Sequence, residues 1–396
     1  MHNADPAQPL IEPAAVPGAR VAFHRPWLGA AETRAVARTL RSGALQGDGP
    51  IGQAVEQELA RRLGRREAVL TTSATAALDA VLAALSPEVG EVILPAFAFP
   101  STAALLVARG FCPVFADIEP VTLGLDPEQV TACLSLRTRA IIHVDYGGWG
   151  GAIEEVAALA QQHGVPLIED AAHALGATHQ GRPLGVWGRA ACLSFHETKL
   201  ITCGEGGALL TDDAAMAEAA RRYREYGTDR AAYRRGTAKG YAWQGSGSSL
   251  LLAEPLAALL QIQLARLDEA IARCRRISRA YREALKPWDG GAVQLSPPSR
   301  SGTESSGHTF YMLLADAAQA DALITAAAQE GIALRRHFPA LNRAPFAVAQ
   351  GLSARLPVTE SVAARLVRLP VYPGLTCEEQ ERVIACVLGF LGAAHA

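Results

Sequence analysis

Short apolar runs alternate with helical patterns through the middle of the chain, from about residue 66 to residue 210. Helix-like segments at 75–85, 101–109 and 152–163 separate these runs. Strands that are buried on both faces read as continuous apolar runs, and helices then cover both faces of the sheet. The pattern therefore predicts an α/β fold with a large, mostly parallel sheet. Its seven predicted strands are 67–72, 91–95, 112–117, 140–146, 165–170, 190–195 and 206–211.

The rest of the chain predicts an arm, a linking helix and a smaller domain around this sheet. Residues 1–20 are rich in Pro and Ala and predict a flexible N-terminal arm, so that the large domain spans 21–253. An amphipathic pattern over 254–287 predicts one long helix within a linking segment, 254–290. Residues 291–396 predict a small α+β domain. Its elements are a strand at 310–316 and helices at 317–330, 359–366 and 377–391.

Lys199 stands in a polar turn between two of the predicted strands. Ser194 precedes it, and a Gly-rich bend at 204–207 follows it. A lysine amine forms a Schiff base when its surroundings desolvate it, and glycines let a phosphate-bearing ligand approach the backbone. The position suits such a lysine, although a lone loop lysine is more often a solvated surface charge.

Two carboxylates, Glu169 and Asp170, end the run at 165–170. A buried carboxylate beside the pyridine nitrogen of pyridoxal 5′-phosphate (PLP) keeps that nitrogen protonated, as the cofactor's role as an electron sink requires. We assign this role to Asp170. His173, three residues on, reaches the cofactor's phenolic oxygen if the chain turns helical there. The alternative is that Asp170 caps the next helix and His173 is an ordinary core histidine.

A strand followed at once by a helix, at 71–85, predicts an anion site. The backbone N–H groups of Ala74 and Thr75, the Thr75 hydroxyl and the helix dipole together suit a phosphate. An ordinary Ser or Thr cap without a ligand is the alternative. Phe99, after the next strand, either stacks on a planar ring or belongs to the core.

Composition and charge limit the kinds of molecule that this protein is expected to bind. The chain has 396 residues, 49% of them hydrophobic and 19% charged, with a formal net charge of −2. Because this balance leaves no global basic field, small molecules are expected rather than nucleic acid. No apolar run reaches the ~20 residues that span a bilayer, and the start lacks a secretory pattern, which predicts a cytoplasmic protein. Seven scattered cysteines without a CxxC pair predict reduced thiols and no metal site.

Ten strings along the chain stand in an informative order and spacing. They are SGALQGDGP (42–50), SATAAL (73–78), LPAFAFPST (94–102), HVDYGG (143–148), IEDAAHALGA (168–177), GRPLG (181–185), SFHETKLITCGEGG (194–207), EYGTDR (225–230), GSGSSLLLAE (245–254) and RLPVYP (368–373). Together they resemble the sugar aminotransferase family of fold-type I PLP enzymes (DegT/DnrJ/EryC1/StrS-like). The closest resemblance is to the subgroup that acts on dTDP-4-keto-6-deoxyglucose at C4, in which FHETK, GTxR and GSS occur together.

The resemblance implies a role for each candidate residue. Lys199 carries the cofactor, Asp170 pairs with the pyridine nitrogen and His173 contacts the phenolic oxygen. Phe99 stacks on the ring. The phosphate-binding residues that it implies are Ala74, Thr75 and Ser194.

The chain departs from the family pattern in two places. Many relatives supply an Asn to the phosphate site from the neighbouring subunit, but the matching position here is Leu251, and Ser248 or Ser249 is the expected replacement. HFPALN (337–342) stands where relatives commonly read HYxPLH, so Asn342 replaces a histidine near the substrate. The substrate candidates are Arg230, for the pyrophosphate, His337 and Asn342. The resemblance also implies a homodimer with shared active sites, in which segments 42–50 and 245–254 cross the interface.

The implied activity is amino transfer from L-glutamate to a nucleotide-linked keto sugar, with pyridoxamine 5′-phosphate (PMP) formed midway. Transfer to a 3-keto sugar and a non-catalytic, PLP-binding regulatory role remain alternatives. A nicotinamide-dependent reductase or epimerase needs GxGxxG, which neither GGWGG (147–151) nor GEGG (204–207) completes. Related sugar dehydratases carry histidine in place of Lys199, which favours transamination over dehydration.

Overall fold

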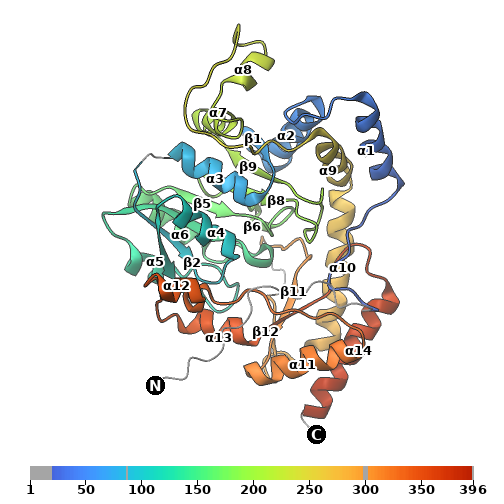
Figure 1. Ribbon diagram of the computed structural model, residues 1–396. Coiled ribbons are helices and arrows are strands. Elements are labelled where there is room, and N and C mark those ends of the chain that lie inside the picture. The colour runs from blue at the N-terminus through green and yellow to red at the C-terminus, as the bar shows by residue number, and fades with distance from the viewer. Residues whose placement is uncertain (1–19, 86–87, 298–301, 395–396) are drawn as a thin grey trace.

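A seven-stranded sheet forms the centre of the computed structural model, which describes residues 20–85, 88–297 and 302–394 (Figure 1). Its strand order is β1-β9-β8-β5-β4-β2-β3. Only β9 runs antiparallel to its neighbours in this sheet. The expected α/β class with a largely parallel sheet is therefore confirmed, and each of the seven predicted runs is a strand. The strands are β1 (Glu67–Thr71), β2 (Glu91–Pro95), β3 (Cys112–Ala116), β4 (Thr138–Val144), β5 (Leu167–Asp170), β8 (Ala190–Ser194) and β9 (Gly207–Thr211).

Helices pack on both faces of this sheet because successive strand side chains point in opposite directions. Val69 and Leu209 join one core cluster with α3 and α7, whereas Leu70 and Leu210 join a second cluster with α2 and α9 (Glu254–Ala265). The predicted helices at 75–85, 101–109 and 152–163 are present as α3, α4 and α6. The helices up to this point are α1 (Ala30–Ser42), α2 (Pro50–Leu63), α3 (Ala74–Leu85), α4 (Pro100–Ala108), α5 (Pro127–Cys133), α6 (Ile153–Gln162), α7 (Ala214–Tyr223) and α8 (Arg230–Arg234).

The single long helix expected over 254–287 is wrong, because the segment forms two helices. α9 (Glu254–Ala265) ends one residue before α10 (Leu267–Leu285) begins, and Arg266 between them leaves helical geometry at ψ 7°. The Arg266 guanidinium lies 3.4 Å from the centre of the Trp27 ring and 2.9 Å from Glu32. These contacts with the N-terminal part of the chain accompany the break. The apolar pattern does not reveal the break, since one non-helical residue barely disturbs its period.

A second, three-stranded antiparallel sheet lies in the C-terminal part, in the order β10-β11-β12. Val21 pairs with Ile332 beside this sheet, so the start of the described chain joins the C-terminal part and not the large sheet. The expected arm, 1–20, falls almost wholly outside the described residues. The C-terminal elements are β10 (Gln294–Leu295), β11 (Phe310–Leu313), α11 (Ala317–Gln329), α12 (Pro345–Ala349), α13 (Pro357–Arg365), β12 (Leu366–Leu369) and α14 (Cys377–Ala394). A small hairpin of β6 (Thr178–His179) and β7 (Arg182–Pro183) follows β5.

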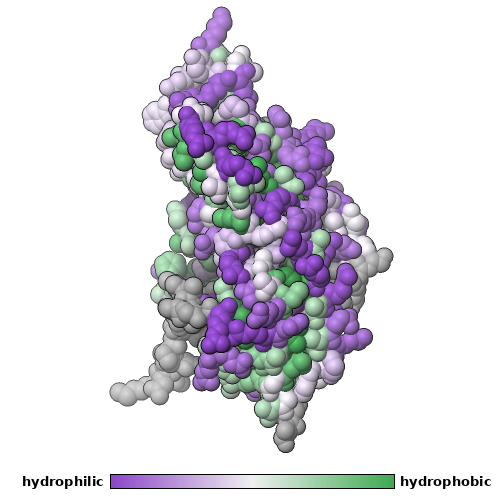
Figure 2. Space-filling view, turned by 90° about the vertical axis from the view of Figure 1, so that its right-hand side faces the viewer, coloured by the Kyte–Doolittle hydropathy of each residue, from purple (hydrophilic) through white to green (hydrophobic). Residues whose placement is uncertain are grey.

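Hydrophilic residues are spread over the face shown in Figure 2, with smaller apolar areas between them in both its upper and its lower half. Within the described ranges, no helix is both long and apolar enough to cross a bilayer. The same residues contain no cluster of His, Cys, Asp and Glu suited to a metal ion. All seven cysteines lie in the described part of the chain, and each is a free thiol.

Candidate active site

A cavity of about 570 Å³ opens at one edge of the large sheet. The carboxyl ends of β1, β5 and β8 meet at this edge, together with the amino end of the antiparallel β9. α/β proteins commonly bind ligands where the carboxyl ends of parallel strands gather. The C-terminal part and the N-terminal segment close the other side. Eight of the predicted residues line the cavity: Ala74, Thr75, Phe99, Asp170, His173, Ser194, Lys199 and His337.

Lys199 lies in the turn between β8 and β9. Two backbone hydrogen bonds pin this turn, from Phe195 N–H to the Gly206 carbonyl (2.8 Å) and from Cys203 N–H to the Phe195 carbonyl (3.0 Å). Burial lowers the pKa of the Lys199 ammonium to about 8, while Asp170 opposes the shift and Arg368 adds to it. A much larger share of this amine is therefore neutral and nucleophilic at neutral pH than for a solvated lysine.

Glu169 and Asp170 are adjacent in β5, and their side chains lie on opposite faces of the sheet. The Glu169 carboxylate accepts hydrogen bonds from the backbone N–H groups of the 185–188 turn, at 2.6 to 2.7 Å. Asp170 accepts from the Ala172 N–H (3.2 Å) and from the Thr102 hydroxyl (3.4 Å) beside the cavity. Burial raises the pKa of Asp170, against these two hydrogen bonds and Lys199. Of the two carboxylates, Asp170 is the one placed to meet a charged group of a ligand.

His173 lies on the cavity wall beyond Asp170. The Gly147 N–H donates to its Nδ1 at 3.4 Å, so the neutral ring carries its proton on Nε2. Burial lowers the pKa of His173 well below its ordinary value, and Lys199 lowers it further. Its ring stacks on that of Phe338 with an interplanar angle of 11°. His173 is thus a fixed, neutral hydrogen-bond donor.

Two helix N-termini converge on the cavity. α3 begins at Ala74, where Ser73 Oγ accepts from the Ala76 N–H (3.0 Å), and α4 begins at Pro100. The Thr75 hydroxyl donates to Ser101 at the start of α4 (2.9 Å). The N–H groups of Ala74 and Thr75 belong to the first helical turn, in which N–H groups have no partner inside the helix. Such a pair of helix starts attracts an anion.

At Gly207, β9 passes very close to the anion cradle, by which we mean the two helix starts at Ala74 and Pro100. A Cβ atom at Gly207 would fall 2.2 Å from the Ser73 carbonyl carbon and 2.4 Å from the Ala74 nitrogen. Only glycine therefore lets the strand pass behind the start of α3. Together with the amine, the carboxylate and the imidazole, this cradle fits PLP: Ala74, Thr75 and Ser194 would hold its phosphate.

Phe99 is 57% exposed at the lip of the cavity. This exposure excludes the alternative that Phe99 is an ordinary core residue, and it leaves the ring available to a planar ligand. His337, which also lines the cavity, accepts a hydrogen bond from the Tyr146 hydroxyl through its backbone carbonyl (2.8 Å).

The other four candidates do not line the cavity of their own chain. Asn342 is fully buried and donates to the Ala354 carbonyl (2.8 Å) and to Glu360 (2.9 Å), so its side chain anchors a loop. Arg230 pairs with Glu225 at 3.5 Å. Ser248 and Ser249 lie in the segment 225–249, which projects at the top of Figure 1. There the Ser249 hydroxyl bonds the hydroxyl of Tyr226 at 3.2 Å.

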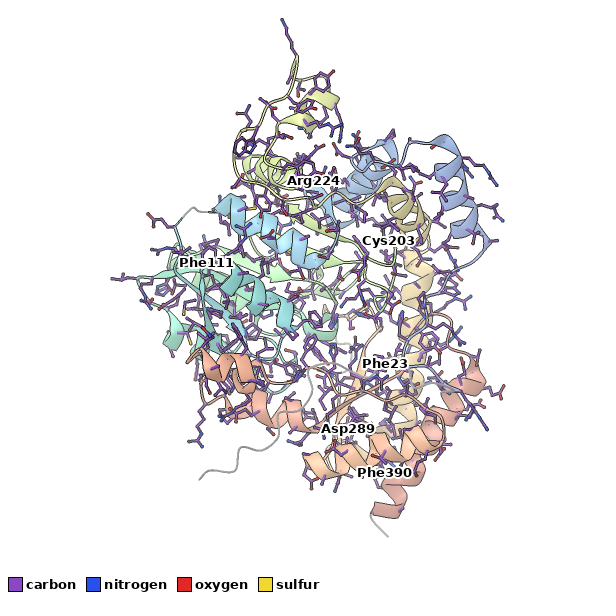
Figure 3. All side chains as sticks on the ribbon, viewed as in Figure 1. Phe23, Phe111, Cys203, Arg224, Asp289 and Phe390 are labelled. Carbon is purple, nitrogen blue, oxygen red and sulfur yellow. The ribbon has the colours of Figure 1, made fainter. Side chains whose placement is uncertain are left out.

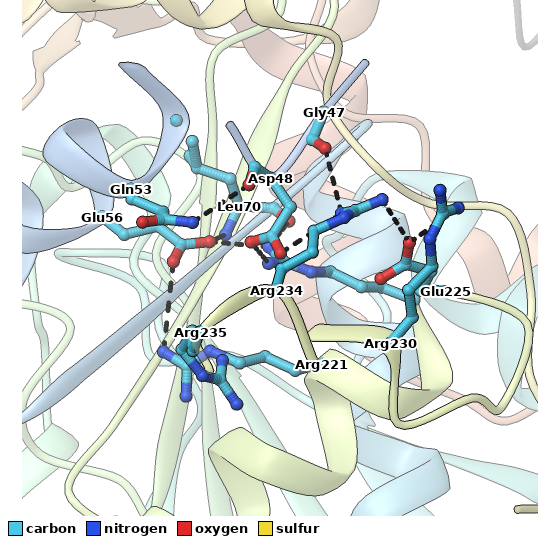
Figure 4. Close-up of polar contacts among 12 residues, drawn as sticks. Gly47, Asp48, Gln53, Glu56, Leu70, Arg221, Glu225, Arg230, Arg234 and Arg235 are labelled. Carbon is cyan, nitrogen blue, oxygen red and sulfur yellow. Dashed lines mark hydrogen bonds and ion pairs between the residues drawn. The ribbon is translucent and has the colours of Figure 1, made fainter. Parts of the chain in front are cut away.

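A buried charge network connects this projecting segment to the loop at 42–50 (Figure 4). Arg224, which is labelled in Figure 3, lies 2.6 Å from both Asp48 and Glu56 and donates to the Leu70 carbonyl. Arg234 extends the network to Glu225 at 2.8 Å. Nothing in the sequence indicates this network, because no spacing in the chain brings residues 48 and 224 together.

Three further groups in the cavity wall were also missed. His24 comes from the N-terminal segment, next to Phe23 near the centre of Figure 3, His308 from the approach to β11 and Arg368 from β12. Arg368 opens the string RLPVYP, which carried part of the family resemblance. That string was the one available signal for this part of the cavity.

Comparisons with known proteins agree with this geometry. The model of the DegT/DnrJ/EryC1/StrS aminotransferase family matches residues 26–388. The aminotransferase TlmJ from Streptoalloteichus hindustanus is 30% identical, over 95% of this chain and 100% of its own, with a TM-score of 0.85. DesI, solved in the presence of its TDP-sugar product, is 33% identical over 92% of each chain, with a TM-score of 0.81.

PseC from Helicobacter pylori, an aminotransferase involved in pseudoaminic acid biosynthesis, is 25% identical, over 94% of this chain and 99% of its own, with a TM-score of 0.86. The family match covers the whole of the large sheet, most of the residues that line the cavity and most of the C-terminal part. The chain therefore belongs to the DegT/DnrJ/EryC1/StrS family of PLP-dependent aminotransferases.

Proposed function

We propose that this protein transfers an amino group from L-glutamate to C4 of dTDP-4-keto-6-deoxyglucose and so forms a dTDP-4-amino-4,6-dideoxyhexose. The observation that carries the proposal is the buried amine of Lys199, which shares one cavity with Asp170 and the two helix N-termini. The TDP-sugar product of DesI supports a nucleotide sugar as the amino acceptor. The joint occurrence of FHETK, GTxR and GSS supports position C4.

PLP, when bound, withdraws electrons from the reacting carbon and carries the amino group between the two half-reactions. In the first half, the neutral Lys199 amine takes the proton from the donor's α-carbon and holds it at Nζ. Nζ would pass this proton to the bound cofactor, and in the second half it would take a proton back from there and deliver it to C4 of the sugar. Asp170 would stabilise the positive charge on the ring nitrogen of the cofactor, and His173 would donate from Nε2 to its phenolic oxygen. One base thus serves both halves of a ping-pong cycle.

The proposal includes a homodimer with shared cavities. Ser248 and Ser249 do not line the cavity of their own chain, and the projecting segment that holds them exposes Trp243 to 80%. A second copy that covers this segment would bury the indole and bring the two serines to the partner's phosphate site. Arg230, on the same segment, would approach the partner's substrate, in line with its expected role at the pyrophosphate.

The test is to incubate the PLP-loaded enzyme with L-glutamate and dTDP-4-keto-6-deoxyglucose, and to identify the product by mass and NMR. The expected product carries one new amino group at C4, and Lys199→Ala abolishes it while the fold is retained. Parallel incubation with a 3-keto isomer distinguishes 3-amino transfer. If L-glutamate does not convert bound PLP to PMP, the non-catalytic alternative is favoured and the proposed activity is refuted.

A further inference from the structure

His24 belongs to the N-terminal segment and lines the same cavity as Lys199. Two backbone hydrogen bonds of 3.0 Å, between Val21 and the chain at 331–333, fix this segment. The His24 ring meets the buried ring of Tyr372 edge-on, with the two ring centres 5.8 Å apart. The imidazole is therefore held in place from two sides as part of the cavity wall.

Hydrogen bonding defines which nitrogen of His24 is free. Burial lowers the pKa of His24 to about 4, against a hydrogen bond with the backbone of Glu197. Within the described residues, His24 Nε2 is buried and has no hydrogen-bond partner. Nδ1 therefore makes the bond to Glu197, and because this bond favours the protonated ring, Nδ1 donates to the carbonyl. The neutral imidazole keeps a lone pair on Nε2, which is thus a buried acceptor.

A buried acceptor without a partner fits a ligand that donates a hydrogen bond. Such unpaired atoms are uncommon in native proteins, and a bound ligand or water is the usual explanation. The carboxylates of L-glutamate only accept hydrogen bonds, so they do not suit Nε2, whereas a hydroxyl of the acceptor sugar does. Lys199 lies two residues after Glu197 and also lowers the pKa of His24. The hydroxyl that Nε2 meets therefore lies close to the reacting carbon.

We propose that His24 is a specificity residue for the acceptor sugar, in which Nε2 accepts a hydrogen bond from the hydroxyl at C3. This inference rests on the proposed function, since it requires a keto sugar that reacts at C4. Of the two ring carbons bonded to C4, C3 carries a hydroxyl and C5 carries the methyl group of the 6-deoxy sugar. Phe23 and Val371, which adjoin His24 and Tyr372 in the sequence, line the cavity and suit that methyl group.

The experiment compares dTDP-4-keto-6-deoxyglucose with its 3-deoxy analogue as acceptors for the PMP form of the enzyme. A site built around a hydroxyl rejects an analogue without it, because the buried acceptor is left unpaired. The wild-type kcat/KM should therefore be about 10- to 100-fold lower for the 3-deoxy sugar. In His24→Phe, which keeps a ring of similar shape, the two sugars should react within about threefold of each other. His24→Gln, whose side-chain oxygen is an acceptor, should restore most of the preference.

Two controls separate specificity from damage to the fold. Conversion of PLP to PMP by L-glutamate, followed by absorbance, should stay within about threefold of the wild-type rate in His24→Phe, since the donor does not use Nε2. Arg25→Gln changes the next residue, whose side chain is 54% exposed, pairs with Glu379 and does not line the cavity. It should leave the preference for the 3-hydroxyl sugar unchanged.

A binding measurement gives a readout that does not depend on turnover. dTDP-6-deoxyglucose and dTDP-3,6-dideoxyglucose have no carbonyl group at C4, so neither can accept an amino group. Calorimetry on the PLP form of the wild type should give a dissociation constant about 10- to 100-fold lower for the first ligand. This difference should vanish in His24→Phe.

Two results would overturn the inference. If the wild type binds both ligands of this pair equally, His24 does not contact the C3 hydroxyl. If His24→Phe keeps the wild-type preference, another group makes that contact. Failure of the proposed function is distinguishable from both, because the wild type would then aminate neither keto sugar, while calorimetry still reports the contribution of the hydroxyl.

Discussion

Gly207→Ala tests the packing between β9 and the start of α3. The backbone of Gly207 is not in the left-handed region, so alanine meets only a steric barrier. The new Cβ would lie 2.2 Å from Ser73, against an optimal carbon separation of about 3.5 Å, so the two backbones must part by about 1 Å. Backbone atoms cannot rotate aside, and overpacking of this kind costs about 1–3 kcal/mol of folding free energy.

The same displacement moves the N–H groups of Ala74 and Thr75 away from the phosphate position. Hydrogen bonds to a charged group contribute about 1.5–3 kcal/mol each, so the dissociation constant of PLP should rise about 10- to 100-fold. Equilibrium dialysis measures this constant, and urea unfolding of the apoprotein measures the stability. Gly389→Ala, in an exposed turn of α14 with no atom within 4 Å of the new methyl group, is the control and should leave PLP affinity unchanged. Wild-type PLP affinity and stability in Gly207→Ala would refute the reasoning.

Three further predictions concern charged groups. Asp170→Asn should slow the donor half-reaction at least about 100-fold without unfolding the protein, since the ring nitrogen loses its counterion; circular dichroism and stopped-flow absorbance check both statements. Capture of PLP by the apoprotein should accelerate as pH rises through about 8, because burial lowers the pKa of Lys199 to that value and only the neutral amine attacks; a flat profile from pH 7 to 9 contradicts this. Arg224→Leu should destabilise the fold by about 3–5 kcal/mol in urea, since it leaves two carboxylates without their buried partner. The surface pair broken by Arg235→Gln should cost under about 1 kcal/mol, and equal losses would argue against the network.

The large sheet could be predicted from the sequence because its strands are buried on both faces. Each of the seven runs is continuous and apolar, and turn residues bound it, so the pattern reports the strand directly. The break at Arg266 could not be predicted, because its contacts with Trp27 and Glu32 come from residues more than 200 positions earlier. Tertiary contacts decided that boundary and local propensity did not.

The residues of the cavity likewise divide into those that the sequence could place and those that it could not. Asp170 ends one strand, and His173 and Lys199 follow strands whose carboxyl ends share one edge, so topology alone places such residues together. His24 and Arg368 share a wall only because the two ends of the chain fold against each other, which no local pattern encodes. Asn342 occupies a position of a family motif, yet its side chain donates to the Ala354 carbonyl and to Glu360. Position in a motif therefore did not determine where this side chain points.

The parallel bridge between Val21 and Ile332 has a practical consequence for protein engineering. Two backbone hydrogen bonds of 3.0 Å fasten the chain there, only three residues before His24. A truncation that reached Val21 would release Phe23 and His24 from the wall of the cavity and leave Lys199 and its sheet intact. Such a shortened protein should keep its large sheet but lose part of the wall that closes the cavity, so trimming from this end has to stop before residue 21.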